Sequence, residues 1–375
     1  MLKDIVKQAF EKFHLETQYQ KLRTFILSEG HTQYNYRFNK QSLELDPTKK
    51  NLVLLGVPSF ANLGDQAILL AEREFIHDYF SDRALIEVPE TEIASVVDYL
   101  GKNLHEGDVL TYHGGGNVGT MGLGQEYRRR LVVEKIKFTP IISFPQSVFF
   151  GSDYPAELKK SQQAYDNSKN FVLVARENYS YDQAQKLFTN VRLKLTPDIV
   201  FYLLKKKDYQ LLTNYAPKKV LLVIRDDIEK QVDDSKITQL AKYLKEQDYQ
   251  LDRTDTTLPG QFLTDENRKK TVDDKLQQFA DHDVVITDRL HGVIFSLLKA
   301  RPVIALKNSN FKIESTIKTW LGDCPLVYFI DDASTDNVAA ALEQISKVTP
   351  KAVKSWYDRL DFDKLYAPLI KSIKK

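Results

Sequence analysis

From residue 51 onward, short apolar runs rich in β-branched residues alternate with segments whose apolar residues recur at helical spacing. This alternation is typical of βαβ units, in which a helix connects two parallel strands. The first such pair is the apolar run at residues 52–57 and the helical pattern at residues 65–80. The sequence therefore predicts an α/β protein built on parallel sheets.

The alternation occurs in two halves of the chain. In the first half we expect strands at residues 52–57, 84–88, 109–113, 140–144, 171–175 and 191–195. After Pro197, a charged segment without a clear period interrupts the pattern and marks a boundary. In the second half we expect strands at residues 220–224, 249–254, 284–287, 303–306 and 326–330, and helices at residues 237–246, 275–280 and 291–300.

Chain length also favours two domains, because 375 residues exceed the roughly 250–300 at which a single hydrophobic core stops growing. The expected parts are a helical segment at residues 1–46, doubly wound domains at residues 47–205 and 206–348, and a C-terminal helix at residues 349–375. Ligands of such folds bind beyond the carboxyl ends of the strands. We therefore expect a site in the crevice between the two halves.

Composition and charge exclude several classes of protein. The 53 basic residues nearly balance the 51 acidic ones, so no overall field attracts nucleic acid. The single cysteine, Cys324, allows no intramolecular disulfide and no cysteine-rich zinc site. The first residues lack the apolar core of a signal peptide, and no apolar run approaches the ~20 residues of a membrane span. We expect a cytoplasmic protein, and leave its oligomeric state and peripheral contact with the inner face of the membrane open.

The most informative residues follow the expected strands. The first group, Asn62, Gly64 and Asp65, lies between a strand and a helix. Gly64 permits a close backbone approach, and Asp65 stands where a helix N-cap belongs. Asp65 therefore either caps the helix or accepts a proton from a substrate hydroxyl, and one role does not exclude the other.

The second group is a run of glycines after the strand at residues 109–113. Gly114, Gly116 and Gly119 match the dinucleotide-binding pattern G-x-G-x-x-G, but they follow the third expected strand rather than the first. We therefore discount a dinucleotide. Gly114, Gly115 and Gly116 still expose backbone amides that suit an anion or a sugar.

The third group ends two neighbouring strands and consists of Gln146 and Arg176. An arginine at the carboxyl end of a parallel strand faces the ligand side, and its planar fork suits a carboxylate or a phosphate. The alternative is a purely structural salt bridge, with Glu177 or across the two halves.

The fourth group, Asp288, Arg289, His291 and Gly292, lies between a strand and a helix. His291 would stand at the positive end of that helix, where an anion is also stabilised. A lone histidine is usually structural, but this one has charged neighbours at the carboxyl end of a strand. The combination favours a functional role for His291.

These groups, in this order, resemble the motif series of the polysaccharide pyruvyl transferase family. The shared motifs are Asn62-Leu63-Gly64-Asp65, Gly114-Gly115-Gly116, Pro145-Gln146-Ser147, Ala175-Arg176-Glu177, Pro197-Asp198 and Asp288-Arg289-Leu290-His291-Gly292. Each motif alone is weak, whereas the ordered series spans nearly the whole of the expected folded part.

The resemblance implies two Rossmann-like domains facing a central cleft, similar to the GT-B glycosyltransferases. It implies phosphoenolpyruvate as the donor substrate, no cofactor, and a carbohydrate acceptor, free or lipid-linked. By motif position, Arg176 and His291 match the family's donor-binding and catalytic positions, and Asp65 matches an acidic position near the acceptor. Lys312 falls where the family often has a lysine after the last motif, and Arg225 is a further candidate for the anion site.

Pyruvyl transfer suits these residue types. Cationic side chains and a helix N-terminus must replace the hydration of phosphoenolpyruvate, and Arg176 with Arg289 or Lys312 can do so. His291 exchanges protons near neutral pH, so we expect it to be the general acid or base, with Asp65 as its complement on the acceptor side. The sequence shows no cluster of residues with metal-ligand spacing.

Three other functions compete with this interpretation. A GT-B glycosyltransferase that uses a nucleotide sugar would need the same cleft and the same residue types. A non-catalytic carbohydrate-binding protein would not need Asp65, Arg176 and His291 together, and a nicotinamide oxidoreductase depends on the discounted glycine pattern. We expect a pyruvyl transferase of exopolysaccharide or cell-wall polysaccharide biosynthesis, with the glycosyltransferase as the alternative.

Overall fold

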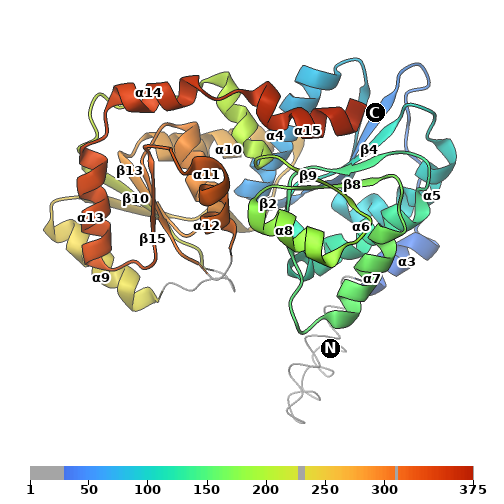
Figure 1. Cartoon of the computed structure of the whole chain (residues 1–375), viewed down its shortest axis with the longest axis horizontal. Coiled ribbons are helices and arrows are strands. Elements are labelled where there is room, and N and C mark those ends of the chain that lie inside the picture. Colours follow the sequence, from blue (N-terminus) through green and yellow to red (C-terminus); the bar gives the residue numbers. More distant parts are fainter. Residues whose placement is uncertain (1–28, 227–232, 309–310, 375) are drawn as a thin grey trace, which may run out of the picture.

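Two parallel sheets, one in each half of the chain, form the framework of the protein (Figure 1). The computed structural model describes residues 29–226, 233–308 and 311–374. Most of the helical segment expected at residues 1–46 lies outside the described residues, and the structure shows α3 (His31–Phe38) in the remainder. The α/β class expected from the alternating pattern is confirmed.

The first sheet has eight strands in the order β3-β1-β4-β6-β8-β7-β5, with β9 paired to β8. Every strand pair in it is parallel. Its strands are β1 (Asn51–Val57), β3 (Ala84–Pro89), β4 (Val109–Tyr112), β5 (Gly115–Gly119), β6 (Ile141–Ser143), β7 (Gln146–Phe149), β8 (Phe171–Ala175) and β9 (Arg192–Leu195). Its helices are α4 (Leu63–Phe80), η2 (Glu90–Glu92), α5 (Ile93–Asn103), η3 (Thr120–Gly122), α6 (Leu123–Lys135), α7 (Pro155–Asp166) and α8 (Asn178–Leu187).

Strand β1 shows why this sheet is covered on both faces. All of its residues are buried, and successive side chains point to opposite faces. Leu54 belongs to the same buried cluster as Phe75 of α4, whereas Val53 belongs to a second cluster with Val97 of α5. Apolar side chains on both faces of a parallel strand require helices on both faces, which is the doubly wound arrangement.

The second sheet has five parallel strands in the order β11-β10-β13-β14-β15. Its strands are β10 (Lys219–Val223), β11 (Gln250–Thr254), β13 (Val284–Thr287), β14 (Val303–Leu306) and β15 (Val327–Ile330). Its helices are α9 (Asp234–Glu246), α10 (Asp265–Ala280), α11 (Leu290–Leu298), α12 (Lys312–Thr316), the π-helical turn η5 (Ile317–Leu321) and α13 (Thr335–Ser346).

The strands expected from apolar runs are confirmed to within one or two residues. Strands that lack such a run were not predicted, namely β2 (Phe60–Asn62), β5, β7 and β12 (Thr257–Phe262). Helix α10 begins at Asp265 rather than at residue 275. Its first turns carry mainly charged side chains, and a capping box between Thr264 and Asn267 starts the helix there instead.

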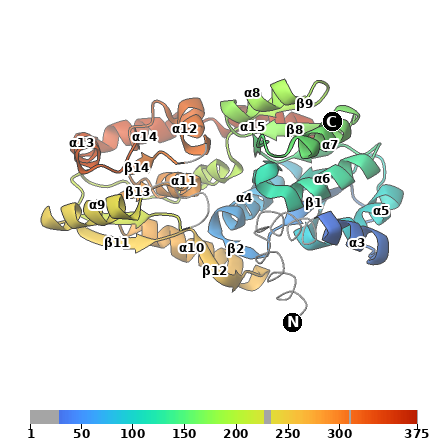
Figure 2. The same cartoon turned by 90° about the horizontal axis from the view of Figure 1, so that it is seen from below.

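Strands β2 and β12 join the two halves. They pair antiparallel, and Figure 2 shows them side by side between the two sheets. Two further backbone hydrogen bonds flank this ribbon. Leu63 N–H donates to the Thr256 carbonyl at 2.8 Å, and Leu263 N–H donates to the Ser59 carbonyl at 2.9 Å. Backbone pairing therefore fixes the segment after β1 against the second half.

The C-terminal part of the chain crosses back to the first half (Figure 1). It forms two helices, α14 (Pro350–Asp358) and α15 (Phe362–Lys374), where one was expected at residues 349–375. Tyr366 of α15 is buried against Phe75 and against Tyr202 of η4 (Ile199–Lys206). Its hydroxyl donates to the Asp198 carbonyl at 2.7 Å. The C-terminal helix thus packs beside the segment that links the two halves.

None of the helices that the structure describes is both long enough and apolar enough to cross a bilayer.

The glycine run after β4 forms strand β5 and not a phosphate-binding loop. The next helix, α6, begins only at Leu123, so the strand–turn–helix context of a dinucleotide site is absent from this segment. Gly119 has φ +103° and pairs with Phe149 of β7. A Cβ atom at Gly119 would stand 2.1 Å from the Phe149 carbonyl oxygen. Close strand pairing therefore accounts for this glycine.

Replacing Gly119 by alanine should lower the free energy of unfolding by at least about 2 kcal/mol, because the side chain would meet both a forbidden φ and a backbone clash. Chemical denaturation measures this value. Gly322→Ala is the matched control, since a Cβ there has no heavy atom within 4 Å. Equal stability of the two variants would contradict the strand assignment.

Candidate active site

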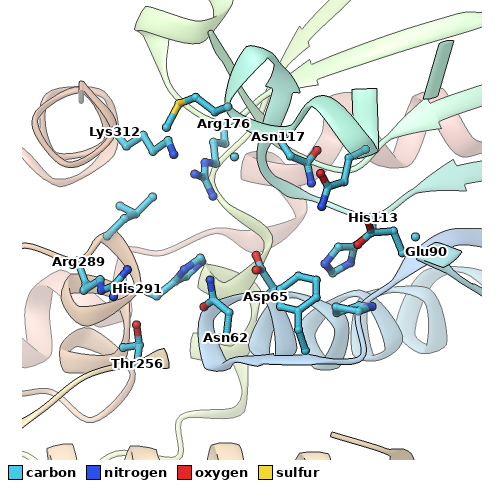
Figure 3. A pocket seen from close by; sticks show the side chains of 18 of the residues that line it. Asn62, Asp65, Glu90, His113, Asn117, Arg176, Thr256, Arg289, His291 and Lys312 are labelled. Carbon is cyan, nitrogen blue, oxygen red and sulfur yellow. The ribbon is translucent and has the colours of Figure 1, made fainter. Parts of the chain in front are cut away.

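A polar cavity of about 220 Å³ lies between the two halves (Figure 3). The first half contributes residues after β1, β4 and β8, and the second half contributes residues after β10, β13 and β14. This is the carboxyl edge of both sheets, where parallel α/β folds bind ligands. The expected crevice is therefore a cavity lined by both halves.

Most of the residues singled out in the sequence meet at this cavity. Those that line it are Asn62, Asp65, Gly116, Arg176, Arg225, Arg289, His291 and Lys312. They come from segments far apart in the chain, and the fold brings them together.

Four of the expected substrate-binding residues do not line the cavity but support its wall. Gly114 N–H donates to the Glu72 carboxylate at 2.7 Å, and Gln146 donates to the His113 carbonyl. The Asp288 carboxylate accepts from Arg225 N–H at 2.9 Å, and burial raises the pKa of Asp288 to about 6. The fourth is Gly115, in β5. Direct contact of these four with a substrate stays a prediction.

Asp198 lies close to two of the expected site residues, Arg176 and His291. One of its carboxylate oxygens lies 2.7 Å from Nη1 of Arg176 and 3.6 Å from Nε2 of His291. Burial alone would raise the pKa of Asp198, but His291 and Arg176 outweigh this effect and hold the pKa well below its usual range. A buried, ionised carboxylate therefore holds Arg176 and His291 in one cluster.

Arg176 follows β8 and is fixed from several sides. Its Nε donates to the Ser147 hydroxyl at 2.8 Å, and its backbone carbonyl accepts from the Trp320 indole at 2.8 Å. The Glu177 carboxylate is farther away, at 3.5 Å from Nε. The salt bridge considered from the sequence is thus secondary to the one with Asp198.

Lys312 begins α12, which docks on the start of α8. Backbone N–H groups of Asn178 and Tyr179 donate to hydroxyls of Thr319 and Ser315, each at 3.1 Å. This docking brings the Lys312 ammonium to the cavity. A Cβ atom on Gly116 would stand 2.9 Å from Nζ of Lys312 and 3.1 Å from Nη2 of Arg176. Gly116 therefore leaves the space in which the two cations converge.

His291 stands in the first turn of α11, and its neighbours shape that turn. Arg289 N–H donates to the Thr287 hydroxyl at 3.0 Å, and a Cβ on Gly292 would stand 2.3 Å from the same oxygen. The Arg289 guanidinium makes a two-point ion pair with Asp255, at 2.8 and 2.6 Å. The residues around His291 thus set the start of the helix.

Gly64 allows the imidazole of His291 to reach the first half. A Cβ atom on Gly64 would stand only 2.1 Å from Nδ1 of His291. Gly64 lies in the first turn of α4, whose N-cap is Asn62, because the Asn62 side chain accepts from Gly64 N–H at 3.0 Å. The capping role considered for Asp65 therefore belongs to Asn62. Asp65 instead lines the cavity (Figure 3).

The sequence analysis missed a second histidine in the cavity wall, His113. Its Nδ1 lies 2.7 Å from the Glu72 carboxylate, and both side chains are buried. Burial raises the pKa of Glu72. Burial lowers the pKa of His113, but the adjacent Glu72 carboxylate outweighs this effect and raises it. The sequence did contain one indication of this pair, because Glu72 is a charged residue within the apolar stripe of the helix expected at residues 65–80.

Among the residues that the structure describes, no group of three or more His, Cys, Asp or Glu side chains is arranged to hold a metal ion.

A family model described as polysaccharide pyruvyl transferase matches residues 62–310 of the chain. General stress protein 30 of Bacillus subtilis (strain 168) is 30% identical, over 86% of this chain and 91% of that protein. Pyruvyl transferase 1 of Schizosaccharomyces pombe (strain 972 / ATCC 24843) is 28% identical, over 80% of this chain and 74% of that protein.

Solved structures show the same fold at low sequence identity. A functionally uncharacterised protein from Klebsiella pneumoniae superimposes with a TM-score of 0.50 at 23% identity, covering 76% of this chain and 93% of that chain. Anabaena HepE, solved with UDP and glucose, superimposes with a TM-score of 0.51 at 11% identity, covering 87% of this chain and 100% of that chain. The fold is the expected GT-B-like arrangement of two Rossmann-like domains facing a cleft.

Replacing Gly64 by alanine should disrupt the cluster of Arg176, His291 and Asp198. Its methyl group would push the His291 ring away from Asp198, because a Cβ there would stand 2.1 Å from Nδ1 of His291. We expect inorganic phosphate, titrated calorimetrically, to bind about tenfold more weakly, a change of about 1.4 kcal/mol. Gly101→Ala in α5, where a Cβ makes an ordinary contact at 3.4 Å, is the control. Wild-type affinity in the Gly64 variant would contradict this account.

Proposed function

The chain belongs to the polysaccharide pyruvyl transferase family, and we propose on this basis that it transfers the pyruvyl group of phosphoenolpyruvate to two hydroxyls of a saccharide. The observation that carries the proposal is the convergence of Arg176, His291 and Lys312 on one end of the cavity. The product is a cyclic ketal, and the acceptor belongs to exopolysaccharide or cell-wall polysaccharide biosynthesis.

The cationic end of the cavity suits the donor. Phosphoenolpyruvate carries a carboxylate and a phosphate, and both bind well to a guanidinium, an ammonium and a helix N-terminus. Arg176, Lys312 and the first turn of α11 supply these three groups. Because Asp255 already holds the Arg289 guanidinium at two points, we assign the donor phosphate to Lys312 rather than to Arg289.

The size of the cavity also fits a small donor. Its volume of about 220 Å³ is below the roughly 300–1,000 Å³ of sites for drug-sized ligands. A three-carbon phosphate ester and the reacting diol of a sugar suit such a volume, and the rest of the acceptor would extend outward. Arg225, which the second half contributes to the lining of the cavity, is assigned to the acceptor side.

The reaction balances without a redox partner or a cofactor. The methylene carbon of phosphoenolpyruvate gains a proton and becomes a methyl group, and one acceptor hydroxyl oxygen bonds to the central carbon. The carbon–oxygen bond to phosphate breaks, and the second hydroxyl oxygen bonds to the same carbon. The two hydroxyls lose two protons in total. The new methyl group gains one proton and the released phosphate gains the other, so the protons balance.

His291 is the group that we assign to protonation of the methylene carbon. Its imidazole lies next to the cations that would hold the donor, and the ionised Asp198 orients it. Asp65 faces the cavity from the other half and is assigned to an acceptor hydroxyl. Asn62, beside Asp65, is available to a second polar group of the sugar.

Replacing His291 by alanine should reduce turnover at least about a hundredfold, the usual scale of general acid–base catalysis. Phosphate release from phosphoenolpyruvate, measured against a panel of methyl glycosides and nucleotide sugars as acceptors, reports turnover. The control is His77→Ala, because His77 is 81% exposed and remote from the cavity. Turnover within threefold of the wild type in a folded His291 variant would remove His291 from the mechanism.

Replacing Lys312 by methionine should weaken phosphoenolpyruvate binding by about 1.5–3 kcal/mol, the contribution of a hydrogen bond to a charged group. Isothermal titration measures the affinity. Lys318→Met, on the exposed face of η5, is the control and should bind like the wild type. Uridine and guanosine diphosphate sugars should not compete at this donor site, and competition by them would favour the glycosyltransferase alternative.

A further inference from the structure

The cavity has two chemically different ends. Lys312 and Arg176 lie at one end, whereas His113 and Glu90 lie at the other, with Asp65 between them (Figure 3). The cationic end of the cavity is assigned to binding of the anionic donor. The opposite end lacks a role in the chemistry described so far, although it carries an imidazole.

His113 is held by a hydrogen bond at one of its two ring nitrogens. Its Nδ1 is held by Glu72, which also accepts from Gly114 N–H at 2.7 Å. Among the described residues, Nε2 of His113 has no hydrogen-bond partner, although the side chain is 6% exposed and lines the cavity. A buried polar atom without a partner costs about 1–3 kcal/mol, so its retention requires an explanation.

Gly56 allows the end of β1 to approach His113 closely. It has φ +96°, and a Cβ there would stand 3.3 Å from the His113 Cβ. Gly56 lies near the end of β1, which pairs with β4 just before His113. On its other side the ring is held through Nδ1 by Glu72.

A second buried histidine shows what a structural role looks like in this chain. Nδ1 of His282 lies 2.7 Å from the Gln278 carbonyl, and its Nε2 lies 2.9 Å from the Asp252 carboxylate. Both ring nitrogens of His282 are satisfied, and His282 does not line the cavity. His113 differs in that it lines the cavity and its Nε2 has no hydrogen-bond partner among the described residues.

We propose that His113 is a catalytic base for an acceptor hydroxyl and that Glu72 is its positioning residue. The inference rests on the proposed function, since ketal formation removes protons from two hydroxyls and Asp65 is assigned to one of them. His113 Nε2 takes the proton of the other hydroxyl as its oxygen bonds to the central carbon of the pyruvyl group. That proton is then passed to the departing phosphate or to water.

Glu72 prepares the ring for this role. A carboxylate that accepts from Nδ1–H leaves the lone pair on Nε2, and it stabilises the imidazolium that forms. The charged groups that face His113 are Glu72 and Asp65 from α4 and Glu90 from η2, and Glu90 is itself paired with Arg128 at 2.6 Å. All three carboxylates favour the protonated ring.

The pH dependence follows from the raised pKa of His113. A base acts in its neutral form, so the rate should rise with pH as His113 loses its proton, at a pH above the 6.5 of an ordinary imidazole. Below that pH the ring is protonated and the rate should fall.

The first test replaces His113 by asparagine, whose amide nitrogen can still donate to Glu72 while the nitrogen equivalent to Nε2 is removed. We expect kcat to fall at least about a hundredfold. Phosphoenolpyruvate should bind within twofold of the wild-type affinity, because the donor is held at the other end of the cavity. The matched control, His282→Asn, should keep wild-type kcat if it folds.

The second test replaces Glu72 by glutamine, which keeps the shape and can still accept from Gly114. Its amide would donate to Nδ1 of His113 and so force the proton onto Nε2. We expect kcat to fall by about 10³–10⁴, the scale seen when an orienting carboxylate becomes an amide. Nitrogen-15 NMR of labelled histidine should show the change of tautomer. If Glu72 had only a structural role, this change of tautomer would not be accompanied by a loss of rate.

The outcomes separate this inference from the proposed function. If the wild type releases no phosphate from phosphoenolpyruvate with any acceptor of the panel, the proposed function fails and the inference fails with it. If the wild type is active, and His113→Asn and Glu72→Gln both turn over within threefold of it, the inference alone is overturned. An unchanged acidic limb of the pH profile in an active His113→Asn protein would also overturn it. If His113→Asn does not fold, Glu72→Gln decides.

Discussion

One buried carboxylate organises the site. Asp198 lies in the segment that links the two halves, and it meets Arg176 from the first half and His291 from the second. A buried ionised group is costly unless it is paired, so Asp198 depends on the neighbouring Arg176 and His291 side chains. Tyr366 from the C-terminal helix binds the carbonyl of the same residue. Three features therefore depend on one another: the relative position of the two halves, the packing of the C-terminal helix on the first half, and the positions of Arg176 and His291.

Close backbone approach is what makes this arrangement possible. Gly64 admits His291, and Gly116 admits Lys312 and Arg176, because any side chain at these glycines would occupy the same space. The antiparallel pairing of β2 with β12 holds the halves at that distance. Within the cavity the charges are then separated, with cations at one end and carboxylates and His113 at the other. Such a division suits an anionic donor that meets a neutral, hydroxyl-bearing acceptor.

Local patterns in the sequence were sufficient for the framework and for part of the site. The apolar runs predicted the strands β1, β8 and β13 because a parallel strand covered on both faces must be apolar at nearly every position. The residues after strand ends predicted Arg176 and His291 at the cavity because all strands of a parallel sheet end at the same edge. Strands without an apolar run, such as β5 and β7, gave no such signal, since close pairing of glycines and polar residues forms them.

The sequence by itself determined the strands with apolar runs and which edge of each sheet carries chemistry, because both follow from short-range periodicity. The tertiary structure decided which side chains share a partner. Asn62 rather than Asp65 caps α4, Asp198 joins Arg176 to His291, and Glu72 holds His113. Spacing along the chain carries no information about such contacts. They depend on the exact turn of the backbone or on the packing of segments that are far apart in the chain.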